Sequence, residues 1–292
     1  MFKTHGNNPL KAQGFTLVEL VTVIIVLGVV SVGLSGIVRT GMGIYTDVTE
    51  RDQLLSDSRF VVERLNRELR MALPNSVRVR GSASTQCIEF VPIEWVTFYT
   101  QLPILPDTSS PVIVNVVEIV DSHAQFSLQS GDFAVVYPTT NADVYDLSNN
   151  KRKKIDACTD TGDGDCNTAD AAGNHLAQLQ VATAFASNSP ASRLNIVRQA
   201  ISYCARSGSI YRHINIDSSG DNIISTIQPL YTSGGILMAE SLVNDLTIAS
   251  DLPFRIADAT LRRNALVQIL LAFEHNDEIV TYSNGVHIPN VP

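Results

Sequence analysis

A glutamate stands at the start of a long apolar run in this chain. Glu19 precedes the apolar residues 20–38, and a lone carboxylate within hydrocarbon costs roughly 2.5–3.5 kcal/mol on insertion scales. Cutting the chain after Gly14 would create a cation beside it, because the new α-amino group of Phe15 would lie four residues from Glu19 on one helical face. The spacing therefore predicts an amine–carboxylate pair, formed within one chain or between adjacent chains.

These residues resemble the processing site of type IV prepilins and pseudopilins. Gly14-Phe15-Thr16-Leu17-Val18-Glu19 follows a short leader that contains Lys3 and Lys11, and it opens the apolar run. The resemblance implies that a prepilin peptidase cuts between Gly14 and Phe15 and methylates the new N-terminal Phe15. It also implies that Glu19 is the assembly carboxylate. The implied partners are the peptidase, other major and minor pilins, and an inner-membrane assembly platform.

Residues 15–38 are long enough to cross a membrane, because about 20 apolar residues span the hydrocarbon core. Lys3 and Lys11 lie before this segment, so the positive-inside rule keeps the leader, residues 1–14, in the cytoplasm and exports the rest. We therefore expect a single-pass inner-membrane protein with a periplasmic C-terminal domain. The resemblance implies that it later joins a pilus, at the cell surface, or a pseudopilus.

Other targeting interpretations fit these residues less well. An uncleaved signal anchor would leave Glu19 in the membrane without a partner. A secretory signal peptide has its apolar core before an Ala-x-Ala-like cleavage site, and Ser35-Gly36 is the nearest approach to one after this run. A lipoprotein anchor needs an early cysteine, whereas the first cysteine here is Cys87.

The composition argues against general binding of nucleic acids. The chain has 292 residues and a net charge of −8, and loss of Lys3 and Lys11 with the leader would make it more negative. Nucleic-acid binding depends on clustered cations that face phosphates. One local basic run is present, Lys151-Arg152-Lys153-Lys154, and we expect it to be a solvated loop.

All four cysteines follow the apolar run: Cys87, Cys158, Cys166 and Cys204. An even number in an exported domain indicates two disulfides formed in an oxidising compartment. The sequence permits three pairings. We favour Cys158–Cys166, which closes a short polar loop, together with Cys87–Cys204, which joins two strand-like segments. Free buried thiols are the alternative.

The helix is expected to continue beyond the membrane segment as an amphipathic helix over residues 39–73. Apolar residues recur there at spacings typical of one helical face: Leu55, Val62, Leu65, Leu69 and Ala72. Gly36, Gly41 and Gly43 weaken the helix by about 1 kcal/mol each relative to alanine, and Pro74 ends it. Close packing between helices is a second interpretation of the small residues near Gly36.

Residues 74–292 are expected to form a β-rich globular domain, so the predicted fold class is α+β, with the long helix packed on antiparallel strands. The expected strands are 87–92, 112–120, 133–137, 194–204, 209–216, 241–248, 266–273 and 278–286. Arg206-Ser207-Gly208 and His275-Asn276-Asp277 are turn signals, and each predicts a hairpin.

Two polar stretches are expected to be surface insertions, residues 101–111 and residues 139–174. The second contains Asp160, Asp163 and Asp165, whose carboxylates suit Ca²⁺. The spacing departs from an EF-hand loop, because the glycine at the sixth position and the distal glutamate are missing. Calcium binding and an ion-free polar loop both stay open, and we expect no other metal or cofactor.

No pattern for catalysis is evident. The six histidines are scattered along the chain: His5, His123, His175, His213, His275 and His287. None forms the His-Glu-x-x-His pattern of zinc hydrolases. The chain also lacks a Gly-x-Ser-x-Gly elbow and a phosphate-binding P-loop. We therefore expect no catalytic residues and no enzymatic activity.

The resemblance implies a function in fibre assembly. The size of the chain is similar to that of larger minor pilins and of J-type minor pseudopilins of type II secretion. Residues 284–292, and Cys204 in a late strand, are similar to O-type minor pilins of mannose-sensitive haemagglutinin pili. We thus expect a minor pilin that takes part in pilus assembly or initiation, with tip adhesion as a further role. The alternatives are a minor pseudopilin and a membrane-anchored periplasmic enzyme or receptor.

Overall fold

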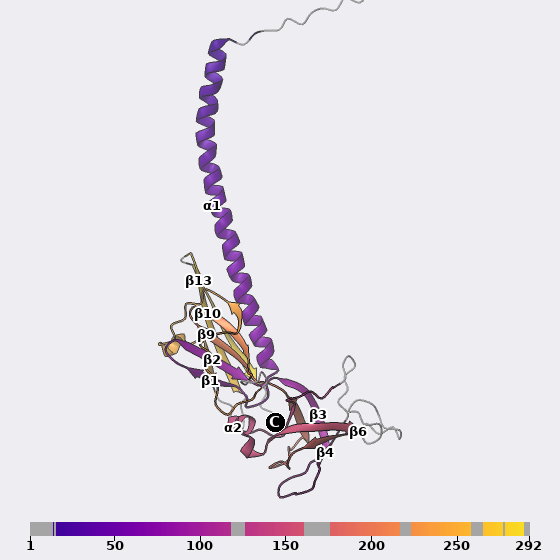
Figure 1. Cartoon of the computed structure of the whole chain (residues 1–292). Helices are drawn as coiled ribbons and strands as arrows, with labels where there is room; N and C mark the ends of the chain where they lie inside the picture. The colour runs from indigo at the N-terminus through magenta and orange to yellow at the C-terminus, as the bar shows by residue number, and fades with distance from the viewer. Residues whose placement is uncertain are drawn as a thin grey trace, which may run out of the picture. The chain divides into compact units, whose positions relative to one another are not determined.

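The computed structural model describes residues 14, 16–117, 126–160, 176–216, 223–257, 265–276 and 278–288 (Figure 1). The chain divides into two compact units, Met1–Gln53 and Leu54–Pro292. Helix α1 (Leu17–Arg70) begins in the first unit and ends in the second, which also contains the strands. The predicted α+β fold class is confirmed.

The first unit consists of the exposed part of α1. The segment Leu17–Asp52 is long and apolar enough to cross a membrane, and none of it is buried. The helix runs without interruption through Gly36, Gly41 and Gly43, and a Cβ at any of these glycines would meet no atom within 4 Å. These glycines therefore lower the intrinsic helix propensity without breaking the helix.

Helix α1 ends at Arg70, three residues before the predicted end. The N–H groups of Met71 and Ala72 bond to carbonyls three residues back, at 3.1 Å each, which tightens the last turn. The N–H of Leu73 then donates to the carbonyl of Val91 at 2.8 Å. Leu73 thus pairs with a neighbouring segment directly before Pro74, and a proline at this position cannot continue the helix.

Two antiparallel sheets accompany the end of α1 in the second unit. The larger has the order β1-β2-β9-β10-β11, with strands β1 (Arg78–Gly81), β2 (Thr85–Phe90), β9 (Ile201–Arg206), β10 (Ser209–Ile214) and β11 (Ile236–Ala239). The smaller has the order β12-β13-β14, with strands β12 (Phe254–Ala257), β13 (Ala265–His275) and β14 (Glu278–Ile288). The hairpins β9–β10 and β13–β14 are the two that the turn signals predicted.

One hydrophobic core joins α1 to both sheets. Leu65 and Leu69 of the helix are fully buried against residues such as Phe90 of β2 and Phe273 of β13. Val62 and Ala72 are buried as well, so most of the predicted apolar stripe faces this core. Since burying a large aliphatic side chain contributes about 1.5–3 kcal/mol, this stripe is the main attachment of the helix.

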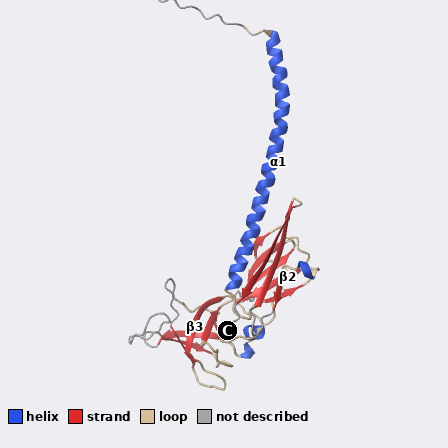
Figure 2. Cartoon of the chain, turned by 180° about the vertical axis from the view of Figure 1, so that it is seen from behind, coloured by secondary structure: helices blue, strands red, loops and turns tan. Residues whose placement is uncertain are grey.

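A second group of strands closes into a six-stranded barrel that the sequence analysis did not foresee (Figure 2). In order around the barrel these are β3 (Ile93–Gln101), β4 (Val112–Val117), β7 (Leu176–Val181), β6 (Arg152–Asp160), β5 (Phe133–Val135) and β8 (Arg193–Val197). The barrel has its own core, which includes Val114, Leu179 and Leu194. Closure leaves its strands without open edges.

Two of the expected strands were wrong. Residues 194–204 form two strands, β8 in the barrel and β9 in the larger sheet, because residues 198–200 carry the chain from one to the other. Residues 241–248 form turns, and in this stretch Leu242 makes an isolated bridge to Phe273. Here the N–H groups of Leu242 and Val243 bond to Gly208 and Ala272, which satisfies the backbone without a ladder.

The expectation of a surface insertion over residues 139–174 was wrong for its first part. This part contains helix α2 (Asn141–Tyr145) and barrel strand β6. Residues 161–175 lie outside the described residues. The other expected insertion, 101–111, is an exposed loop from Leu105 onward.

The basic run 151–154 is also not a solvated loop. Arg152 and Lys153 are buried, at 2% and 6% exposure. The guanidinium of Arg152 donates to the carbonyl oxygens of Tyr145 and Ile224, at 3.4 and 3.0 Å, and lies over the ring of Phe133. The charged ends of Arg152 and Lys153 thus bond to protein oxygens inside the fold, which the run of basic residues in the sequence does not indicate.

A disulfide joins Cys87 of β2 to Cys204 of β9, the pair favoured in the sequence analysis. The two residues are direct partners in the β2–β9 ladder and are 117 positions apart in the chain. In the chain-entropy model a loop of this length stabilises the fold by about 4–5 kcal/mol. Cys158 is also disulfide-bonded, but Cys166 lies outside the described residues, so that pairing stays a prediction.

Candidate processing and assembly segment

The first turn of α1 is capped by a residue that the sequence analysis did not single out. The backbone N–H of Glu19 donates to Oγ1 of Thr16 at 3.3 Å, and the N–H of Leu20 donates to the carbonyl of Thr16 at 3.2 Å. Thr16 is therefore the N-cap, and the spacing Thr-x-x-Glu was the available signal. The cap, two residues after Gly14, fixes the start of the helix at Leu17.

Glu19 lies in this capped first turn. A carboxylate is favoured there, because the N-terminal end of a helix carries partial positive charge. The side chain is exposed, like those of Leu17 and Val18, which are 79% and 70% exposed. Within the part of the chain that the structure describes, Glu19 makes no ion pair. The segment thus presents a carboxylate on an apolar helix that a neighbouring molecule can reach.

Gly14 is exposed, and a Cβ built on it would meet no atom within 4 Å. Phe15 lies outside the described residues. The predicted cut would fall between Gly14 and the N-cap Thr16. The exposed position of Gly14 is suited to a peptidase that must reach the chain just before a membrane helix.

At the other end of α1, a group of polar residues ties the helix to the larger sheet. The carboxylate of Glu68 accepts hydrogen bonds from Nε of Arg64, at 3.0 Å, and from Nε of Arg212 on β10, at 3.1 and 3.2 Å. The hydrogen bond to Glu68 raises the pKa of Arg64. Arg64–Glu68 is the spacing of an i,i+4 ion pair, and Arg212 extends it across the packing interface.

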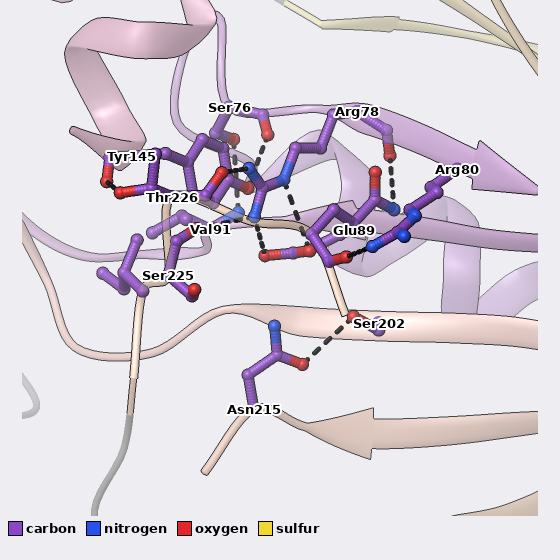
Figure 3. A network of polar contacts seen from close by, with 12 residues as sticks. Ser76, Arg78, Arg80, Glu89, Val91, Tyr145, Ser202, Asn215, Ser225 and Thr226 are labelled. Carbon is purple, nitrogen blue, oxygen red and sulfur yellow. Dashed lines mark hydrogen bonds and ion pairs between the residues drawn. The ribbon is translucent and has the colours of Figure 1, made fainter. Parts of the chain in front are cut away.

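A second polar network lies where the larger sheet meets α2 (Figure 3). Glu89 of β2 is fully buried, and Arg78 of β1 donates to its two oxygens at 3.0 and 3.3 Å. The guanidinium of Arg78 lies 3.5 Å from the centre of the Tyr145 ring, and the hydroxyl of Tyr145 donates to the carbonyl of Ser76 at 2.7 Å. Burial raises the pKa of Glu89 to about 7, against the opposing pull of Arg78.

The arrangement of this network indicates structural support. Arg78 also donates to the carbonyl oxygens of Ser225 and Thr226, at 2.7 and 2.8 Å. Arg78 therefore bonds β1 to β2 through Glu89, to the segment that follows β10, and to the ring of Tyr145 in α2. The groups in it are bonded to one another, so the network joins parts of the second unit.

No metal centre is found in the described parts of the chain, where no three side chains of His, Cys, Asp or Glu gather to hold an ion. Asp160 ends β6, whereas Asp163 and Asp165 lie outside the described residues. The proposed calcium ligands are therefore not placed.

Comparison with known proteins gives one match. Residues 10–35 match the prokaryotic N-terminal methylation motif. No curated protein and no solved structure matches the chain. The matched residues include Gly14, Phe15 and Glu19, together with the start of the apolar helix. Over these residues the chain is similar to the N-terminus of type IV pilins and pseudopilins, and the match supports a prepilin-type N-terminus.

Proposed function

We propose that this protein is a minor type IV pilin, a processed subunit that takes part in assembling or initiating a pilus. The observation that carries the proposal is the capped start of α1. An exposed carboxylate, Glu19, lies in the first turn of an unburied apolar helix, and the methylation motif covers it. A carboxylate in such a segment is costly in lipid unless a partner is provided.

Cleavage after Gly14 provides that partner. The new α-amino group of Phe15 would lie within reach of Glu19 of the same chain or of an adjacent subunit. In a fibre core of low dielectric, a charge pair is favourable only when both members are in place. The pair would thus set the axial register between subunits, while the apolar surface of α1 moves from lipid into the fibre.

The second unit would face outward and provide contacts to sister subunits. Its disulfide, Cys87–Cys204, suits an oxidising compartment, which supports a periplasmic location before assembly. The similarity of residues 284–292 to O-type minor pilins of mannose-sensitive haemagglutinin pili supports a place in such a pilus, with adhesion at the tip as a further role.

The intact mass of the protein purified from its host tests the processing step. We expect a mass that begins at Phe15 and carries one added methyl group. A chain that keeps Met1, or that is cut near Ser35, would contradict the proposal and favour a membrane-anchored enzyme or receptor.

The second candidate function is a minor pseudopilin of a type II secretion system, which the same motif supports. Deleting the gene separates the two. Loss of surface pili with normal secretion of exoproteins supports the minor pilin. Loss of exoprotein secretion with normal pili supports the pseudopilin.

A further inference from the structure

The smaller sheet ends in one long open edge. Among the described strands, β14 pairs only with β13, so one side of this 11-residue strand is open. By contrast, the described edge strands β1, β11 and β12 have four residues each. Natural proteins shorten or cover edge strands, or place lysine and proline on them, because unpaired N–H and C=O groups pair readily with another chain. β14 contains neither lysine nor proline.

The register shows which backbone groups of β14 face this open edge. On β13, the N–H of Leu270 donates away from β14, to the carbonyl of Pro253 at 2.9 Å. The alternate residues of β13, such as Leu271, therefore bond to β14, and Leu271 lies opposite Tyr282. The residues of β14 between these bonded positions direct their backbone groups outward: Ile279, Thr281, Ser283, Gly285 and His287.

These outward groups are available to a ligand. Among the described residues, no backbone hydrogen bond reaches any of them from outside the sheet. All five residues are exposed, and Ile279 is 59% exposed. Alternating N–H and C=O groups along an extended strand are complementary to one class of ligand, an extended polypeptide backbone. Thr281, Ser283 and Gly285 are small, so their side chains leave room for such a strand.

Contacts to β13 and to the hydrophobic core hold β14 in place. The β13–β14 ladder runs without a register shift along all of β14. Val286 and Ile288 of β14 are buried in the shared core. The hydroxyls of Tyr282 and Ser58 are 3.1 Å apart, which ties β14 to α1. A partner strand would therefore meet a preorganised edge, which lowers the entropy lost on binding.

We propose that the open edge of β14 binds an extended segment of a sister subunit in the fibre, which adds to the sheet as a further strand. The proposal rests on the proposed function, because only a fibre subunit has sister subunits beside it. A second copy of this chain fits less well. Two β14 edges related by a two-fold axis would pair antiparallel.

The direction of the hairpin excludes that two-fold arrangement within one fibre. The β13–β14 hairpin lies along the last part of α1 (Figures 1 and 2), where Tyr282 contacts Ser58 and where β13 shares a hydrophobic core with the helix. Antiparallel β14 edges would therefore hold these helical segments in opposite directions. Subunits that enter a fibre from one membrane share one direction. This excludes a second β14 edge as the occupant, and a strand from a different subunit is the occupant that the proposal names.

Photo-cross-linking in the full-length protein, expressed in its host, tests the edge. A photoreactive phenylalanine is placed at Thr281 or at Ser283, and the cross-linked peptides are identified by mass spectrometry. We expect both positions to label one segment of one sister subunit, at sites about two residues apart, as strand pairing requires. The matched control is Gln268, which is exposed on the same face of the sheet but on the central strand β13. The cross-linking yield from Gln268 should be at least tenfold lower than the yield from Thr281 or Ser283.

Two substitutions test the backbone contact. Ser283→Pro removes one outward N–H without removing a bond to β13, whereas Ser283→Ala keeps it. We expect the proline variant to lower cross-linking from Thr281 about tenfold and the alanine variant to leave it unchanged. If the proline variant does not fold, Thr281→Lys replaces it. The photoreactive residue is then placed at Ser283, and we expect the lysine to lower cross-linking from there. Gln268→Lys is the control for this variant.

Three outcomes would overturn the proposal: no cross-link to another subunit, a cross-link to a second copy of this chain, or equal labelling from Gln268. The proposed function is judged separately from the mass of the same samples. Correct cleavage after Gly14 without labelling at β14 rejects only the strand pairing. A retained leader rejects the proposed function.

Discussion

Glu68 of α1 accepts hydrogen bonds from Arg212 of β10 at 3.1 and 3.2 Å, so a partly buried ion pair joins the helix to the larger sheet. Removing one partner leaves the other charge desolvated, which costs more than the net value of the pair.

Replacing Glu68 should therefore destabilise the second unit. We expect Glu68→Ala to lower the free energy of unfolding by about 2 kcal/mol, measured by urea denaturation of the full chain in detergent. Glu63→Ala, an exposed change on the same helix, is the control and should change it by less than about 0.5 kcal/mol. A double-mutant cycle of Glu68→Ala and Arg212→Ala should show that the two losses in free energy of unfolding are not additive. Additive single effects would contradict the role of the pair.

The pKa of Glu89 predicts a pH dependence of stability. Burial raises this pKa to about 7, from an ordinary value near 4.5. The folded state therefore holds a proton that the unfolded state releases between these values, and stability falls as the pH rises through this window. Glu89→Gln removes the titration and resembles the protonated, neutral form that the folded protein holds at pH 5. We expect the variant to be about as stable as the wild type at pH 5 and to lose less stability than the wild type between pH 5 and pH 8.

Thermal midpoints measured across this range check the expectation. Glu94→Gln, on an exposed position of β3, is the control and should follow the wild-type profile. Parallel profiles for the wild type and Glu89→Gln would show that Glu89 does not titrate in this window.

Gly235 is predicted to be less tolerant of alanine than its neighbour Gly234. Both have left-handed backbone angles, with φ of +86° and +71°, so alanine costs about 1–2 kcal/mol at either position. A Cβ on Gly235 would also lie 2.5 Å from the ring of His213, whereas one on Gly234 would meet nothing within 4 Å. His213 is stacked on Tyr231 and buried, which limits its movement.

We therefore expect Gly235→Ala to lower the free energy of unfolding by about 1–3 kcal/mol more than Gly234→Ala. Denaturant titration of the two variants gives this difference directly. Equal losses would mean that the His213 ring moves aside freely.

Glu19→Ala tests the assembly carboxylate. Removing the charge makes the helix easier to insert in lipid, so we expect insertion and cleavage after Gly14 to proceed normally. The variant should nevertheless fail to join fibres, because the α-amino group of Phe15 would have no carboxylate partner. Intact mass reports processing, and immunoblots of sheared fibres report incorporation. Incorporation at wild-type levels would contradict the proposed pairing.

The aspartates that follow β6 in the sequence give a further test, of calcium binding. If Asp163 and Asp165 ligate Ca²⁺, millimolar Ca²⁺ should raise the thermal midpoint of the wild type, since a ligand that binds only the folded state stabilises it. Asp163→Ala combined with Asp165→Ala should abolish the rise. An unchanged midpoint in the wild type would exclude a stabilising calcium site.

Local features of this protein were predictable from its sequence. The motif around Gly14 and Glu19 occupies six consecutive residues, and the stripe from Val62 to Leu69 follows directly from the helical period. The β9–β10 turn could also be predicted from the sequence, since Ser207 and Gly208 take the positive φ angles that such turns require. These signals depend on residues close together in the chain.

The barrel and its surroundings were decided by tertiary structure. Strand β3 pairs with β8, about a hundred positions away, and short strands such as β5 have too few residues to show a period. Arg152 is buried because carbonyls of Tyr145 and Ile224 and the ring of Phe133 happen to surround it. The open edge of β14 likewise exists only because nothing in the described fold pairs with it. Burial and pairing between distant segments depend on how the chain closes in space, and no short window of sequence contains that information.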